Sequence, residues 1–388
     1  MSGAEGLRIA QLIESDGPGG AEQVVVDLAT GLQAAGAQSV VFVPRNGEGW
    51  LARQLEGSGV AVEPFALERP LSPAAAGGIA AALRRHAVHL AHGHEFSMAV
   101  YGAWASRLAG LPHLITMHGG RYYAGHLRRR LALRLAVASS GATVAVSSGL
   151  AAHLGRDLHV RPTRITVIPN GVRPRPADPR RPGLREALGL GPDHRLLVSV
   201  GNLYPVKGHR HLLDALALLA ARHPRLHLAI AGRGHLEGAL SARARQHGLA
   251  RRVHLLGLSS DVPGVLAAAD VFVLPSLSEG LPLALLEAMF AGRAIVASDV
   301  GDVGAALAHG DAGVLVPAGD PPALADAIHG LLADPSRARS LGESAARRAA
   351  SEYGQAQMLR RYGALYGELL ARRGRTVALR AAGATAAK

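Results

Sequence analysis

Residues 270–289 read DVFVLPSLSEGLPLALLEAM, and this stretch contains a complete unit of strand, loop and helix. The run 270–274 is short, apolar and rich in β-branched and aromatic residues, which predicts a buried strand. Pro282 suits the first turn of a helix, and the residues after it are apolar on nearly every side, which predicts a buried helix. A buried strand followed by a buried helix is typical of the βαβ units of a parallel sheet.

The same alternation extends over the whole chain in both directions. In the first half, the expected strands are 7–13, 37–43, 58–62, 88–91, 113–117, 142–147 and 164–168. In the second half they are 196–200, 226–231, 253–256, 270–274, 294–298 and 313–316. Residues 173–183, RPRPADPRRPG, separate the two series, and their prolines disfavour both helix and central strand. We therefore predict an α/β protein with two doubly wound, Rossmann-like domains that face each other across a cleft, with ligands near the carboxyl ends of the strands.

The domain bounds follow from this pattern and from the length of 388 residues, which is more than one hydrophobic core usually organises. We expect one domain over 1–175 and a second over 184–354. A last periodic segment covers 355–372, and the alanine-rich end, 373–388, is expected to be a flexible tail.

The composition excludes several classes of protein. The chain has no cysteine, which rules out disulfide scaffolds, zinc-thiolate and iron-sulfur sites and a cysteine nucleophile, and fits a reducing compartment. Residues 1–7 lack the features of a secretion signal, and no apolar run approaches the ~18 residues that cross a bilayer, so we expect a cytoplasmic protein. The net charge of +13 suits a phosphorylated small molecule or an anionic membrane surface. Nucleic acid is not an expected partner, because the arginines are scattered and only two Trp, seven Tyr and five Phe are available for base stacking.

Of the 42 lysine and arginine residues in this chain, only two are lysine, and the rest are arginine. Lys388 is terminal, whereas Lys207 lies in the loop Gly201-Asn202-Leu-Tyr-Pro-Val-Lys207-Gly208, directly after an expected strand. A compact ammonium at that place is well positioned to stabilise a leaving diphosphate. The alternative is an ordinary surface lysine.

Two glycine-rich loops also follow strands. The loop DGPGG, 16–20, precedes an expected helix, so the backbone at Gly19 and Gly20 can approach a phosphate or form a tight turn. The loop Gly232-Arg233-Gly-His-Leu-Glu-Gly238 departs from the dinucleotide fingerprint in its spacing and its position. We expect a structural turn there, whose amides could line a nucleotide pocket.

Two glutamates stand out in the quoted stretch. Glu279 lies in the loop before the helix, followed by Gly280 and Leu281, and Glu287 lies inside the helix. A carboxylate in an apolar helix is costly unless it accepts hydrogen bonds, and the hydroxyls of a ribose or hexose are suitable donors. A glutamate that reaches the rim or pairs with an arginine is the alternative.

Together these motifs resemble the retaining family-4 glycosyltransferases of GT-B fold. The resemblance rests on E-G-x-P-x4-E at 279–287, G-x5-K-G at 201–208, VIPNG at 167–171 and GGAE at 19–22, in the family's order over nearly the entire chain. It implies that the helix 355–372 crosses back to the first domain. It also implies a nucleotide diphosphate sugar as the donor substrate, with no cofactor. No metal is expected, because no Asp-x-Asp or His cluster stands at the end of an expected strand.

The resemblance assigns roles to individual residues. Gly19 and Gly20 would approach the donor diphosphate, Lys207 would neutralise it, Glu287 would bind the ribose and Glu279 the donor sugar. His118, in Thr-Met-His-Gly after an expected strand, would lie beside the reacting sugar. The donor-binding set also includes Asn202, Gly232, Arg233, Gly280 and Leu281. Asn202 stands where the family commonly has arginine. The negative charge of the diphosphate would therefore be stabilised by Lys207, backbone amides or Arg233. Gly301-Asp-Val-Gly304 stands where a Gly-Gly pair is common.

The segment 126–138, HLRRRLALRLAVA, is basic and amphipathic. Such a helix can lie on an anionic membrane and bring a lipid-linked acceptor to the enzyme, or it can be a surface helix. Tyr122 and Tyr123, just before it, are candidates for the acceptor side, and the alternative is that they only pack against the domain.

These observations predict a transferase that moves a hexose or N-acetylhexosamine from a nucleotide diphosphate sugar to a glycan or lipid-linked acceptor in cell-envelope polysaccharide synthesis. The enzyme would be cytoplasmic or peripheral on the inner face of the plasma membrane. A non-catalytic nucleotide-sugar or glycan-binding relative, an NADP-dependent oxidoreductase of similar topology and a nucleotide-sugar epimerase remain as alternatives.

Overall fold

The computed structural model describes residues 6–67, 72–119, 123–180 and 182–385, with the backbone alone from 375. It divides into two compact units, Met1–Asn170 with Gln355–Lys388, and Gly171–Gly354. The first unit ends earlier than the expected 175, because the Val172 amide donates a hydrogen bond of 2.8 Å to the Tyr353 carbonyl of the second unit. The expected linker therefore lies within the second unit, and its residues 173–180 form neither helix nor strand.

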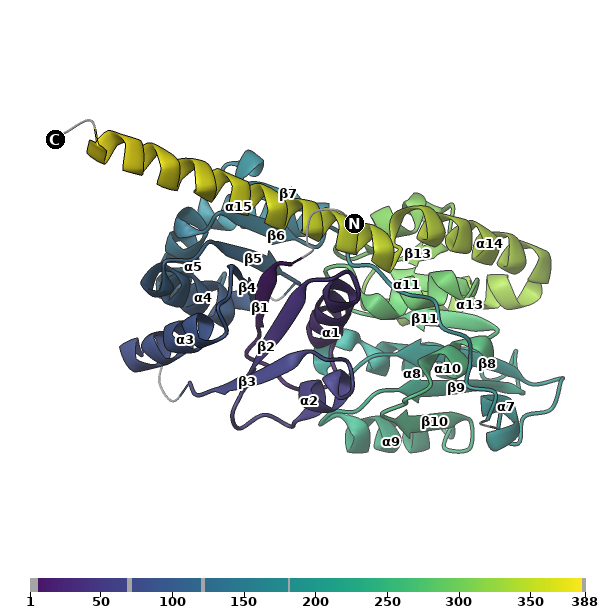
Figure 1. The fold of residues 1–388 in the computed structure, drawn as a ribbon. Helices are drawn as coiled ribbons and strands as arrows, with labels where there is room; N and C mark the ends of the chain where they lie inside the picture. Colours follow the sequence, from purple (N-terminus) through teal and green to yellow (C-terminus); the bar gives the residue numbers. More distant parts are fainter. Residues whose placement is uncertain (1–5, 68–71, 120–122, 181, 386–388) are drawn as a thin grey trace. The chain divides into compact units, whose positions relative to one another are not determined.

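The first unit is built on a sheet of seven parallel strands in the order β3-β2-β1-β4-β5-β6-β7 (Figure 1). The strands are β1 (Arg8–Leu12), β2 (Gln38–Pro44), β3 (Ala61–Phe65), β4 (Leu90–His94), β5 (His113–Met117), β6 (Ala142–Ala145) and β7 (Ile165–Val167). The helices that connect them are α1 (Gly20–Ala34), α2 (Trp50–Leu55), α3 (Pro73–Arg85), α4 (Glu95–Ala109), α5 (Leu127–Ser139) and α6 (Ser148–Leu158). The chain order reverses between β1 and β4, and ligands of doubly wound sheets commonly bind at the carboxyl ends of the strands beside such a reversal.

The second unit repeats this plan with six parallel strands in the order β10-β9-β8-β11-β12-β13. The strands are β8 (Arg195–Val200), β9 (Leu226–Ala231), β10 (Val253–Gly257), β11 (Val271–Leu274), β12 (Ala294–Ser298) and β13 (Val314–Val316). The helices are α7 (Leu184–Ala187), α8 (His209–Leu219), α9 (Glu237–Gln246), α10 (Val262–Ala267), α11 (Leu283–Phe290), α12 (Val303–Ala306), α13 (Pro321–Ala333) and α14 (Pro335–Glu352). Here the order reverses between β8 and β11.

The prediction of two Rossmann-like α/β domains is confirmed, and each expected strand is present with small shifts. The largest shifts concern two strands of the first unit. We expected a strand over 58–62, but β3 begins at Ala61, because Gly57 and Gly59 adopt positive φ angles of 73° and 76° and form a turn. The strand expected over 88–91 runs instead from Leu90 to His94, where buried histidines extend it.

The last helix, α15 (Gln355–Thr385), belongs to the first unit. Its Leu359 packs so closely on α1 that a Cβ atom at Gly31 would lie 2.5 Å from the leucine Cδ1. Tyr362 and Tyr366 are buried. We expected this helix to end at residue 372 and a flexible tail to follow, but the helix continues to Thr385. Residues 373–385 contain no proline and are rich in alanine and arginine, both of which favour helix.

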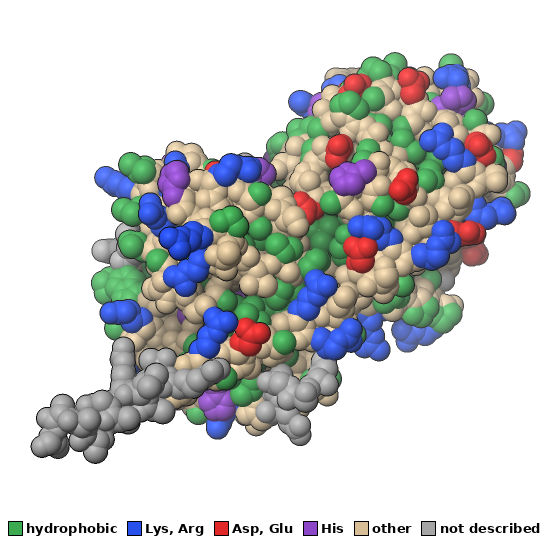
Figure 2. All heavy atoms as spheres, turned by 90° about the horizontal axis from the view of Figure 1, so that it is seen from above, with side chains coloured by type: hydrophobic (Ala, Val, Ile, Leu, Met, Phe, Trp, Pro, Cys, Tyr) green, Lys and Arg blue, Asp and Glu red, His purple; other side chains and the backbone are tan. Residues whose placement is uncertain are grey.

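Basic side chains are spread over the face shown in Figure 2, with acidic side chains among them. In the described part of the chain, no helix is both long and apolar enough to span a bilayer.

Candidate active site

Lys207 and Glu279 form an ion pair in the second unit, although 72 residues separate them. Lys207 follows β8 and Glu279 follows β11, and these two strands are neighbours at the point where the strand order reverses. The Lys207 ammonium donates a hydrogen bond of 2.6 Å to Glu279 Oε1, and the Ser276 hydroxyl donates one of 2.7 Å to the same oxygen. The Lys207 side chain is 26% exposed and that of Glu279 9%, so solvent and ligands reach the cation more easily than the carboxylate.

Glycines bring these two loops together. Gly208 has a φ of 66°, and a Cβ atom there would lie 1.9 Å from the Pro275 carbonyl oxygen. Gly301 has a φ of 57°, and its Cβ atom would lie 2.1 Å from the Glu279 carbonyl oxygen. Since only glycine fits both conformations and both spaces, each loop is held against its neighbour at a fixed distance. Gly301 thus supports the glutamate loop, at the place where the sequence departs from the usual Gly-Gly pair.

Glu287 lies on α11, between the buried residues Leu286 and Ala288, and is partly buried itself. The helix begins at Leu283, one residue later than expected. Pro282 is its N-cap and has an extended ψ of 132°. Just before it, Leu281 is buried and anchors the loop, and Gly280 accepts a hydrogen bond of 3.1 Å from the Asp302 amide.

The loops at Asn202 and Arg233 are bound to each other through their backbones. The Leu203 amide donates a hydrogen bond of 2.8 Å to the Arg233 carbonyl, and a Cβ atom at Gly232 would lie 1.9 Å from the Gly201 carbonyl oxygen. The glycine at 232 is therefore required for close packing between the loops after β8 and β9. This explains the G-x-G pattern without a dinucleotide.

His209, which the sequence did not single out, lies directly beside the Lys207 loop. It is buried, and its Nε2 is 3.3 Å from the Gly201 carbonyl oxygen. Burial lowers the pKa of His209 to about 4, so its imidazole is neutral at pH 7 and donates to that carbonyl. The only signal in the sequence for this contact with the Lys207 loop was the position of the histidine, immediately after Lys207-Gly208.

In the first unit, Gly19 is the N-cap of α1 and Gly20 its first residue. No atom of the described residues lies within 4 Å of a Cβ built on Gly20, so within that part of the chain this end of the helix is open. A Cβ on Gly19, by contrast, would meet the Glu22 carboxylate at 2.3 Å. In the same loop, the buried Asp16 accepts hydrogen bonds of 2.7 Å from two amides at the start of α2, which fixes the course of the chain.

His118 follows β5, beside the end of β4. Its Nε2 is 2.9 Å from Nδ1 of His94, and its backbone amide donates a hydrogen bond of 3.0 Å to Glu95. Burial lowers the pKa of His118 to about 4, so the ring is neutral at pH 7. His94 lies at the end of β4 and also binds Gln11 of β1. The sequence analysis did not identify His94 as the partner of His118, or Gln11 as the partner of His94.

The expected acceptor-side tyrosines have different outcomes. Tyr122 lies outside the described residues. Tyr123 is fully buried and packs in the same core as Met117 and Leu133, so its expected role at an open acceptor surface is wrong. A large aromatic ring buries more apolar surface in the core than at the rim.

The basic segment forms α5, whose Leu127, Leu131 and Leu135 are 79%, 56% and 61% exposed. These leucines are spaced by four residues and share one face, whereas Leu133 is buried against the domain. Arg128 and Arg134 are exposed, and the helix contains no acidic residue.

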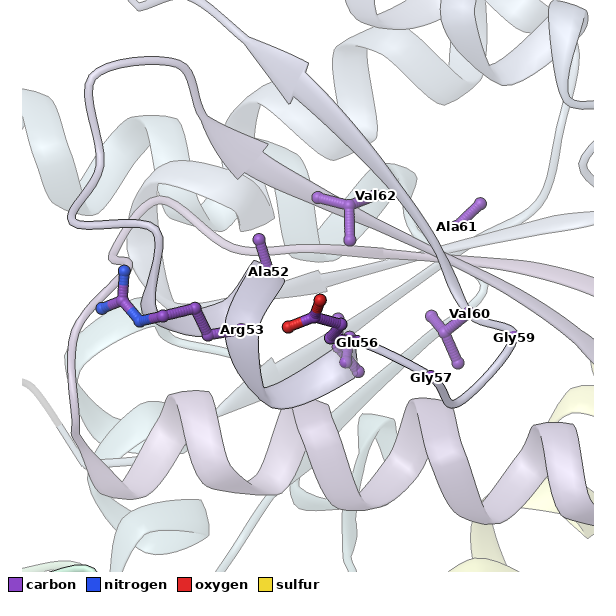
Figure 3. Close-up of a pocket in the computed structure, with 9 residues that line it drawn as sticks. Ala52, Arg53, Glu56, Gly57, Gly59, Val60, Ala61 and Val62 are labelled. Carbon is purple, nitrogen blue, oxygen red and sulfur yellow. The ribbon is translucent and has the colours of Figure 1, made fainter.

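A hollow of about 570 Å³ lies between α2 and the start of β3, lined by Ala52, Glu56, Gly59, Val60 and Val62 among others (Figure 3). It is at the amino end of an edge strand, whereas the candidate residues follow the carboxyl ends of strands. We therefore assign it no part in the site. Among the described residues, no group of three or more His, Asp or Glu side chains is arranged to hold a metal ion.

Comparison with known proteins adds two family models, which match adjoining parts of the chain. "Glycosyltransferase Family 4" matches residues 18–175, and "Glycosyl transferases group 1" matches residues 181–348. Alpha-maltose-1-phosphate synthase of Mycolicibacterium smegmatis is 31% identical, in an alignment that covers 70% of this chain and 77% of that protein. D-inositol 3-phosphate glycosyltransferase 2 of Catenulispora acidiphila is 37% identical over 49% of this chain, which spans only about half (47%) of that relative's length.

A solved structure supports the same fold. Anabaena HepE in complex with UDP-glucose is 24% identical, with a TM-score of 0.81 over 94% of this chain and 100% of that one.

Proposed function

Because the chain belongs to the family-4 glycosyltransferases of GT-B fold, we propose that it transfers a hexose or N-acetylhexosamine from a nucleotide diphosphate sugar to a glycan or lipid-linked acceptor, with retention of configuration. The observation that carries the proposal is the Lys207–Glu279 pair at the reversal of strand order in the second unit.

The pair suits the two ends of an activated sugar. As the bond from C1 of the sugar to the diphosphate oxygen breaks, the electron pair goes to that oxygen, and the Lys207 ammonium stabilises the growing negative charge. Glu279 gives up its hydrogen bond from the Lys207 ammonium and accepts hydrogen bonds from sugar hydroxyls instead. The Ser276 hydroxyl continues to donate to the Glu279 carboxylate and keeps it oriented. The acceptor hydroxyl forms the new bond to C1 on the same face and gives its proton to the leaving diphosphate. Glu287 would bind the ribose hydroxyls, and His118 a hydroxyl of the transferred sugar.

In this mechanism the cation on the diphosphate is Lys207, so the proposal includes independence from metal ions and from cofactors. The Asn202 position offers no charge for the diphosphate, which leaves Lys207, the loop amides and Arg233 to stabilise it.

The test is a panel of UDP-, GDP- and ADP-sugars. One of them should raise the melting temperature, since a ligand that binds only the folded state stabilises it by mass action. The same donor should be hydrolysed slowly without acceptor and unaffected by EDTA. Indifference to every donor would contradict the proposal. Stabilisation without hydrolysis or transfer would indicate a binding relative, and sugar interconversion without acceptor would indicate an epimerase. Stabilisation by NADP would indicate an oxidoreductase.

We also propose that α5 places the protein on an anionic membrane surface, such as the inner face of the plasma membrane, where lipid-linked acceptors of envelope polysaccharides are available. The support is the exposed row of leucines among exposed arginines, since apolar side chains enter the lipid and each basic residue adds about 1 kcal/mol near an anionic surface.

Co-sedimentation with vesicles tests this second part. The protein should bind phosphatidylglycerol vesicles and not phosphatidylcholine vesicles, and the variant with Leu127→Ser, Leu131→Ser and Leu135→Ser should lose binding. Leu218→Ser is a control, because that leucine is 56% exposed on α8. Equal binding of the triple variant and the control would refute the membrane role of α5.

A further inference from the structure

The first unit contains a continuous run of buried polar side chains, of which the proposed transfer uses only His118. The run begins at His118, after β5, and connects strands β1, β4 and β5 with the last helix. Its other members are Gln11, His92, His94, Thr116, Tyr362 and Tyr366, each at most 1% exposed. A buried polar group costs free energy unless it is hydrogen-bonded, so the arrangement of protons within this run is constrained.

His94 is the junction that fixes the proton on His118. Its Nε2 is 2.8 Å from Gln11 Oε1, which can only accept, so the single proton of the neutral His94 ring lies on Nε2. Nδ1 of His94 is then bare and accepts across the 2.9 Å to His118 Nε2. Burial lowers the pKa of both rings far below 7, so each ring carries one proton. The proton of His118 is therefore on Nε2, and its Nδ1 is bare.

The rest of the run agrees with this direction. Gln11 Nε2 donates to the Tyr366 hydroxyl at 3.4 Å, and that hydroxyl donates to His92 Nδ1 at 2.8 Å. His92 Nε2 then donates to the Thr116 hydroxyl at 2.7 Å, which bonds Tyr362 at 3.1 Å. In this direction His92, His94, Thr116 and Tyr366 each donate one hydrogen bond and accept one within the run. The protons are inferred here from the partners of each heavy atom.

His118 Nδ1 is buried and has no hydrogen-bond partner among the described residues. It is an unsatisfied acceptor at the carboxyl end of β5, where the loops of a doubly wound sheet bind ligands.

We propose that Gln11 and His94 are positioning residues, which hold the proton of His118 on Nε2 so that its Nδ1 accepts a hydrogen bond from a substrate hydroxyl. The inference rests on the proposed function for the identity of that hydroxyl, which belongs to a sugar. It assigns a role to α15 as well, because the Tyr366 hydroxyl accepts the hydrogen bond from Gln11 Nε2. Rotating this amide by 180° would reverse every bond in the run and turn His118 Nδ1 into a donor.

NMR of the full-length protein labelled with ¹⁵N-histidine tests the tautomer directly, without any substrate. Loss of one signal in His118→Asn assigns the ring. We expect a protonated Nε2 and a bare Nδ1 on His118 at pH 7. A proton on Nδ1, or an even mixture of the two tautomers, overturns the proposal. This outcome is independent of whether the protein transfers a sugar.

Variants then test the positioning role. In His94→Phe, the His118 ring should become a mixture of both tautomers. Gln11→Leu should have the same effect, and it serves as the test if His94→Phe does not fold. His92→Phe is the matched control, since His92 is equally buried on the same strand but bonds Tyr366 and Thr116. It should leave the His118 signals unchanged. An unchanged His118 in both His94→Phe and Gln11→Leu refutes the role.

Once the donor is known, turnover gives a second readout. Loss of one well-placed hydrogen bond predicts that His94→Phe transfers sugar about tenfold more slowly. His92→Phe should transfer it at close to the normal rate. Equal slowing of the two variants would show that the run contributes only to stability.

Discussion

Replacing Lys207 by methionine should reveal both functions of the ion pair. The substitution removes the ammonium from Glu279, whose side chain is 9% exposed, and leaves the carboxylate with Ser276 as its described partner. Exposed pairs contribute about 0 to 1 kcal/mol, whereas breaking a fully buried pair costs about 3 to 5 kcal/mol. Because Lys207 is 26% exposed, the pair is intermediate, and we expect a loss of about 2 kcal/mol in the free energy of unfolding.

Urea unfolding of four proteins measures this value: the normal protein, Lys207→Met, Glu279→Gln and the double variant. In the double variant neither charge is left unpaired, so its loss should be smaller than the sum of the single losses. Arg243→Met is the control, since it breaks a pair with Asp214 of the same 2.6 Å length on helices α8 and α9. It should reduce stability but not turnover.

Turnover of the donor should fall by about two to three orders of magnitude in Lys207→Met, because the stabilisation of the leaving diphosphate is lost. Additive stability losses in the cycle would show that the pair does not form in solution. Near-normal turnover would remove Lys207 from the mechanism, even if the pair contributes to stability.

Three further predictions concern the scaffold. Gly208→Ala should destabilise the protein by more than about 2 kcal/mol, because its Cβ atom would overlap the Pro275 carbonyl, while Gly238→Ala, with open space around it, should be neutral or stabilising in urea unfolding. Asp16→Asn should cost about 1 to 3 kcal/mol, since the amide nitrogen cannot accept from the second of the two amides at the start of α2; an unchanged unfolding midpoint would contradict that capping role. Stability should also fall as the pH drops from 6.5 towards 4, because the unfolded chain binds protons that buried neutral histidines do not. These histidines have a lowered pKa: His92, His94, His113 and His118. His113, with a pKa of about 3, alone accounts for about 3 kcal/mol at pH 4, and flat unfolding midpoints between pH 7 and 4 would refute this.

Much of the fold could be predicted from local pattern. Short apolar runs that alternate with helical periods identified the strands of both sheets, because a strand buried on two faces must be apolar along its length. The prediction was poorest where that rule fails. In β4, His92 and His94 are polar yet fully buried, since Gln11, Thr116 and the tyrosines of α15 satisfy them.

The candidate site could also be predicted in part from local pattern. The residues Lys207, Glu279 and Glu287 were conspicuous in sequence, since each is a charge beside a glycine turn or inside an apolar helix. Their neighbours His209 and Ser276 were not, because a histidine or serine gives no signal until its surroundings are known. Tyr123 misled the prediction, because an aromatic residue near a strand end suits a core as well as a binding surface.

The sequence by itself determined which segments are strands and helices, where the chain divides approximately, and which charged residues belong to loops. Only the tertiary structure decided that Lys207 meets Glu279 and that α15 completes the hydrogen bonds of His92. Periodicity reports which face of a segment avoids water. Contacts across 72 residues or more depend on strand order and on the close approach that glycines such as Gly208 permit, and no local pattern specifies these.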